Sequence, residues 1–115
     1  MIELLDAWDS GEVPDRAAVK SAVKATLAAL VDVAPGRSVE VRVPPYAAVQ
    51  AVGGTTHRRG TPPAVVECDA RTWLELATGR LDWADAVADG RVRASGERSD
   101  LSAYFPLTAP GADGG

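Results

Sequence analysis

The longest amphipathic pattern lies in the first third of the chain. Asp15 can cap a helix, and after it apolar side chains recur at intervals of three or four residues. These positions are Val19, Val23, Leu27, Leu30 and Ala34. Pro35 and Gly36 follow and do not continue a helix. The pattern therefore predicts a helix from Asp15 to Ala34, preceded by a short amphipathic helix within residues 1–12.

Alternating apolar and polar residues follow this helix and indicate strands. Residues 39–43 read VEVRV, and the pattern resumes at 46–52 after two prolines that cannot donate to a sheet ladder. A polar stretch, 53–63, precedes a third predicted strand at 64–68. Because the links between these strands are short, we expect an antiparallel meander.

The stretch from 69 to 96 encodes several short elements in succession. Asp69 and Asp82 each suit a helix N-cap, and Gly79 and Gly90 suit the left-handed residue that ends a helix. Residues 91–95, RVRAS, then alternate as in a strand with one solvated face. We expect helix, turn, short helix and fourth strand, followed by a closing turn over 101–107.

This arrangement resembles the sterol carrier protein 2 family. The residues that carry the resemblance are Trp73 to Leu76, Gly79-Arg-Leu81, Ala84 to Ala88, Gly90-Arg-Val-Arg93, Ser95-Gly96 and the final amphipathic piece from Leu101 to Leu107. The resemblance implies an α+β fold, with a small antiparallel sheet of four to five strands and helices packed on one face. It also implies an apolar cavity between sheet and helices, no enzyme activity and no cofactor.

The family resemblance places the ligand site on apolar positions in the second half of the chain. Its walls would be Trp73, Leu76, Leu81, Trp83, Val87, Leu101 and Phe105. The same side chains can instead be plain core, because a small domain has few large apolar residues to bury. Two functions stay open. One is non-enzymatic carriage of a lipid or fatty acyl chain; the other is an accessory protein-interaction domain with a closed core, which pairs with a partner or with itself.

Histidine, arginine and cysteine side chains are further candidates for binding or catalysis. His57, Arg58 and Arg59 lie between glycines and threonines, and this loop can bind a carboxylate or phosphate or be a solvated hairpin tip. Cys68 is the single cysteine, and we interpret it as a small core residue rather than a nucleophile. No motif indicates a catalytic triad or a metal site.

Composition and charge narrow the function classes. The chain has 115 residues, 46% of them hydrophobic, and a net charge of −4. A net acidic chain argues against a general surface for nucleic acid or anionic membrane. The acidic start lacks a signal-peptide pattern, and no run of residues is long and apolar enough to span a bilayer. We expect a bacterial cytoplasmic protein with one domain over 1–107 and a flexible tail over 108–115.

Overall fold

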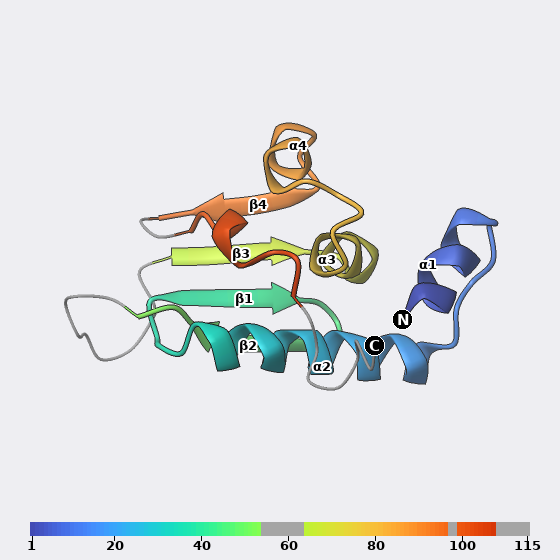
Figure 1. The fold of residues 1–115 in the computed structure, drawn as a ribbon, viewed down its shortest axis with the longest axis horizontal. Coiled ribbons are helices and arrows are strands. Elements are labelled where there is room, and N and C mark those ends of the chain that lie inside the picture. The colour runs from blue at the N-terminus through green and yellow to red at the C-terminus, as the bar shows by residue number, and fades with distance from the viewer. Residues whose placement is uncertain (54–63, 97–98, 108–115) are drawn as a thin grey trace.

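The computed structural model describes residues 1–53, 64–96 and 99–107. Its elements are α1 (Ile2–Asp9), α2 (Arg16–Val33), β1 (Val39–Val43), β2 (Ala47–Ala51), β3 (Ala64–Cys68), α3 (Ala70–Ala77), α4 (Trp83–Ala88), β4 (Val92–Ser95) and a 3₁₀ turn η1 (Ser102–Tyr104). The strands form one sheet in the order β2-β1-β3-β4 (Figure 1). The predicted α+β class is confirmed.

The predicted all-antiparallel sheet is wrong at one strand pair. β1 and β2 form an antiparallel hairpin, closed by a hydrogen bond from the Tyr46 amide to the Val43 oxygen (2.9 Å). β3, however, lies parallel to β1 on its other edge, and β4 then pairs antiparallel with β3. The twelve residues between Ala51 and Ala64 exceed the roughly two to five of a hairpin loop, so β3 need not pair with β2, and it lies on the opposite side of β1. This crossover makes β1 an inner strand with a neighbour on each side.

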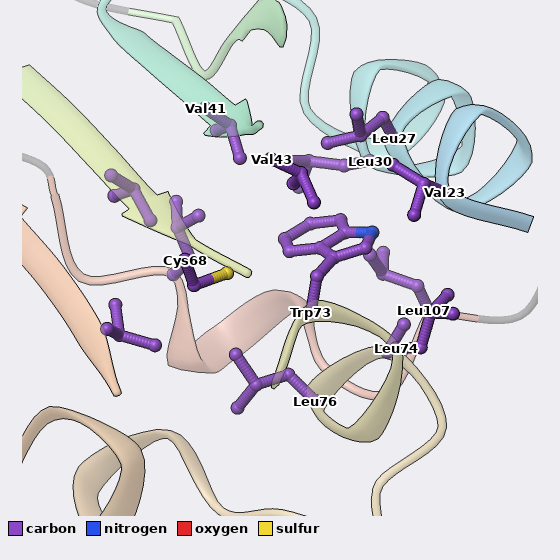
Figure 2. Packing of buried hydrophobic residues seen from close by; sticks show 14 of the residues in the cluster. Val23, Leu27, Leu30, Val41, Val43, Cys68, Trp73, Leu74, Leu76 and Leu107 are labelled. Atoms are coloured by element: carbon purple, nitrogen blue, oxygen red, sulfur yellow. The ribbon is translucent and has the colours of Figure 1, made fainter. Parts of the chain in front are cut away.

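The core lies on one face of this sheet. Val39, Val41 and Val43 of β1 are fully buried, whereas Arg42 between them is exposed and pairs with Glu40 (2.9 Å). The buried strand residues join apolar side chains of α2 and α3 in a single cluster, part of which Figure 2 shows. The predicted stripe of α2 is confirmed, with every member buried.

The predicted ends of the helices are confirmed by their capping geometry. Asp15 accepts from the Ala18 amide (3.0 Å), and Asp69 and Asp82 cap α3 and α4 in the same manner. Gly79 and Gly90 follow those two helices with φ of +82° and +77°. Such angles are strained for residues with a Cβ atom, which explains glycine at both positions.

A close backbone crossing joins the end of α2 to the end of β2. The Val52 amide donates to the Ala34 oxygen (2.6 Å), and the Ser38 amide donates to the Val52 oxygen (2.9 Å). Gly36 lies between them at φ +151°, and a Cβ atom there would lie 2.2 Å from the Val52 oxygen. Only glycine allows this approach. Val52 itself has a positive φ of 67°, which is rare for a β-branched residue.

Some predictions fall outside the described residues. The loop with His57, Arg58 and Arg59 and the tail 108–115 are among them. Within the described parts of the chain, no helix is both long and apolar enough to cross a membrane.

The crossing at Gly36 predicts a sharp difference between two glycine substitutions. Gly36→Ala should lower the free energy of unfolding by more than about 3 kcal/mol, because strained φ and a backbone clash act together. Gly90→Ala should cost only about 1 kcal/mol, since its φ is also positive but a Cβ there meets nothing within 4 Å. Urea denaturation measures both, and equal costs would contradict the crossing.

Candidate functional site

Three aromatic side chains from separate elements meet at one end of the core. Phe105, just after η1, lies between Trp73 of α3 and Trp83 of α4. Its ring centroid is 5.6 Å from that of Trp73, edge to face at 76°, and 5.9 Å from that of Trp83, stacked at 19°. Both arrangements are favourable for aromatic pairs. We call Trp73, Trp83 and Phe105 the aromatic cluster.

Most of the other predicted wall residues lie in the same core. Leu76 and Leu101 are fully buried, and Leu81 is partly buried against the core. Val87 is different, because its side chain is 41% exposed. Helix α4 turns Trp83 and Ala86 inward, which leaves Val87 on the solvent side. The structure therefore brings six of the seven predicted residues into or against one apolar cluster and leaves Val87 out.

The segment that carries Phe105 is attached mainly through its apolar side chains. Leu101 and Leu107 are buried at its two ends. Among the described residues, its one main-chain hydrogen bond to the rest of the fold runs from the Leu107 amide to the Ala77 oxygen (2.7 Å). Asp100 accepts from the Ser102 amide (2.9 Å), which holds the pKa of Asp100 below its ordinary value. This local bond shapes the turn without tying it to the sheet.

A buried hydrogen bond joins the side chain of Trp73 to α2. Its indole Nε1 donates to the Thr26 hydroxyl oxygen on α2 (2.7 Å). Thr26 in turn donates to the main-chain oxygen of Ala22 (2.7 Å), and both side chains are fully buried. The indole N–H is thus satisfied in the core, and α3 is held at one position along α2.

A network of ion pairs links α3 to α1 and to the start of β4. Glu75 pairs with Arg71 on its own helix (3.1 Å) and with Arg91, which leads into β4. Arg71 also reaches Asp9 of α1 (2.9 Å), and Arg80 after α3 contacts the same carboxylate (3.3 Å). Because Glu75 is only 13% exposed, its two arginine partners offset the cost of burying its charge. The network thus links α3 to α1 through exposed pairs and to the residue before β4 through the less exposed Glu75.

Cys68 behaves as a core residue. Burial raises the pKa of its thiol to about 12, with a further contribution from the neighbouring carboxylate of Asp69. At neutral pH the thiol is therefore protonated, and the thiolate needed for nucleophilic chemistry is scarce. The structure supports the interpretation of Cys68 made from the sequence.

A surface hollow of about 280 Å³ lies where β3 ends and β4 begins. It is lined by Pro44, Glu67, Cys68, Asp69, Thr72, Gly90, Arg91 and Arg93. Its charges are mixed in sign, and none of the aromatic cluster lines it. In the described ranges, no group of three or more histidine, cysteine or carboxylate side chains is placed to hold a metal ion.

Comparison with known protein families shows to which family the chain belongs. A family model described as bacterial SCP ortholog matches residues 15–107. The chain belongs to this family. The part that matches the SCP ortholog family contains every predicted wall residue and the whole sheet, whereas α1 precedes it. No curated protein matches the chain significantly.

The polar contacts in this part of the fold were not predicted from the sequence. Thr26 occupies a position three residues after Val23 on the apolar stripe of α2, and that placement is the signal that could have marked it as buried. Its partner, Trp73, could not be inferred from spacing. For Glu75, the i,i+4 spacing could have indicated Arg71 as a partner, but nothing local indicated Arg91.

The Thr26–Trp73 bond should be measurable as a coupling energy. Thr26→Val leaves the buried indole N–H without an acceptor and should cost about 1–3 kcal/mol. In a Trp73→Phe background, which has no N–H, the same change should cost much less. Urea denaturation of the four proteins completes the cycle. Equal costs in both backgrounds would show that the hydrogen bond contributes nothing to stability.

Cys68 should resist alkylation in the folded protein. At pH 8, iodoacetamide should label the native thiol at least about a hundredfold more slowly than the urea-unfolded chain. Because the folded pKa lies above the ordinary value of 9.0, the unfolded chain loses its proton first as pH rises. The free energy of unfolding should therefore fall above about pH 9, and Cys68→Ala should remove that part of the fall. Similar labelling rates in both states would contradict this.

Proposed function

We propose that this protein binds and carries a small apolar or amphipathic ligand, such as a fatty acyl chain, without catalysing a reaction on it. The observation that carries the proposal is the aromatic cluster, closed by a segment with few polar ties to the rest of the fold. Membership of the family supports the same role. We expect the protein to act in the cytoplasm.

The ligand would enter by displacing Phe105 from between the two tryptophans. Trp73, Leu76 and Leu101 are fully buried, so the closed form leaves no open surface at these residues. Moving Phe105 costs its aromatic contacts, worth about 0.5–1.5 kcal/mol each beyond the buried area. An acyl chain would offset this, since each buried CH₂ contributes about 0.8 kcal/mol. Trp73, Leu76, Leu81, Trp83 and Leu101 would then line the ligand.

The complete burial of these same residues favours one alternative. A closed core without a ligand would suit an accessory domain that binds a protein partner or a second copy of itself. The two functions differ in one observable property, which is whether the aromatic cluster responds to an apolar ligand.

Tryptophan emission tests the carrier role directly. In a Trp8→Phe background, the remaining tryptophans both belong to the aromatic cluster. Titrating delipidated protein with palmitate should shift their emission, and Trp83→Phe should remove much of that shift. Native mass spectrometry of the same samples should show one bound palmitate. It should also show lipid retained by protein purified from its own host.

Two alanine variants separate displacement from non-specific association. Phe105→Ala should bind palmitate about five- to a hundredfold more tightly, because the ligand no longer has to displace the ring from its two aromatic contacts. Val87→Ala, on the exposed side of α4, should bind as the parent does. If the parent shows neither an emission shift nor a mass adduct, and Phe105→Ala only lowers the melting temperature, the accessory-domain function is the correct one.

A further inference from the structure

A second surface hollow, of about 210 Å³, lies between the start of α2 and the β1–β2 turn. Its walls are Arg16, Ala17 and Lys20 from the helix, and Pro45 and Tyr46 from the turn. No carboxylate is among these residues. We call it the basic hollow. It is separate from the aromatic cluster, which shares no residue with it.

The two cations of the basic hollow are placed where they weaken their own helix. Arg16 and Lys20 are four residues apart on one face of α2, a spacing at which like charges repel. They also lie in the first and second turns, where the helix dipole disfavours positive charge, and the first turn contains no acidic residue. Local stability therefore does not explain why both residues are basic.

Four of the nine lysines and arginines in the described ranges contact a carboxylate. They are Arg42, Arg71, Arg80 and Arg91, in a chain with a net charge of −4. Within the described ranges, neither Arg16 nor Lys20 has such a contact. The nearby carboxylate of Asp15 accepts from the Ala18 amide and does not line the hollow. The hollow thus presents two cations without a carboxylate among its walls.

The chemistry of the walls indicates which anion would fit. The hollow is lined by residues that carry a guanidinium, an ammonium and a phenol hydroxyl, and the oxygens of a tetrahedral phosphate can accept hydrogen bonds from all three kinds of group. A carboxylate has only two oxygens to offer. The hollow exceeds the volume of one phosphate group, and Pro45 and Ala17 add apolar wall beside the charges. We propose that the basic hollow binds the phosphate of a phosphomonoester that carries a small organic group.

The proposal is tested by titrating the full-length protein with phenyl phosphate, with inorganic phosphate and with benzoate. Binding is measured by calorimetry at low and at moderate salt. Phenyl phosphate should bind more tightly than inorganic phosphate, and benzoate should bind weakest. Vesicles of phosphatidylcholine with and without phosphatidic acid form a further arm, which shows whether a lipid headgroup can supply the phosphate.

Lysine variants of the same helix provide a matched comparison. Lys20→Gln should weaken phenyl phosphate binding by about tenfold, the expected effect of losing one charge-assisted contact. Lys24→Gln removes the same charge one turn further on, outside the hollow, and should change binding less than twofold. Melting temperatures of both variants should stay at or slightly above that of the parent, because each removes a like-charge neighbour.

Several results would overturn the proposal. Equal weakening by Lys20→Gln and Lys24→Gln would show a diffuse positive field instead of a site. Equal affinity for benzoate and phenyl phosphate would remove the preference for a tetrahedral anion. Absence of any binding of soluble phosphate or of phosphatidic acid vesicles would refute the site itself. A response to the vesicles that requires Lys20 would support the site and identify the headgroup as its source of phosphate.

Discussion

The position of one buried indole governs the arrangement of the whole second half of the fold. Trp73 is fixed at its N–H by Thr26 and at its ring by Phe105, so it touches α2, α3 and the final segment at once. A polar atom in the core is costly unless it is satisfied, which makes the Thr26 contact a constraint on how the helices meet. The apolar packing around it has no comparable directional demand. The hydrogen bond therefore sets position, and the surrounding leucines and valines supply most of the stability.

The crossover from β2 to β3 determines the order of the strands in the sheet. It places β3 beside β1, so that the strand with the fully buried Val39, Val41 and Val43 has a neighbour on each side. The end of β3 then leads straight into the Asp69 cap, so α3 starts where the sheet stops. The position of β3 in the sheet therefore also determines where α3 begins and where Trp73 lies.

Local features of this structure follow from short stretches of sequence, whereas long-range ones do not. The caps at Asp15, Asp69 and Asp82 depend on a side chain and the turn beside it, and all were predictable. The neighbour of β3 depends on pairing with β1, a strand distant in sequence, which no alternation pattern encodes. Val87 was placed with the core because α4 has fewer than two turns, too few for periodicity to define its inner side. The family resemblance implied that the two tryptophans and Phe105 lie together, but it did not imply the contact with Thr26.

The N-terminal helix α1 is held by fewer buried contacts than the elements around Trp73. It precedes the region shared with the family, and Leu5 is its one fully buried side chain. Its remaining ties include exposed ion pairs from Asp6 and Asp9 to the arginines of α3 and the following turn. Such ion pairs are weak and are screened by salt. The elements around Trp73 are instead stabilised by buried apolar contacts. Among the described elements, we therefore expect α1 to open first under denaturing conditions, with proteolysis or amide exchange beginning there while the sheet remains intact.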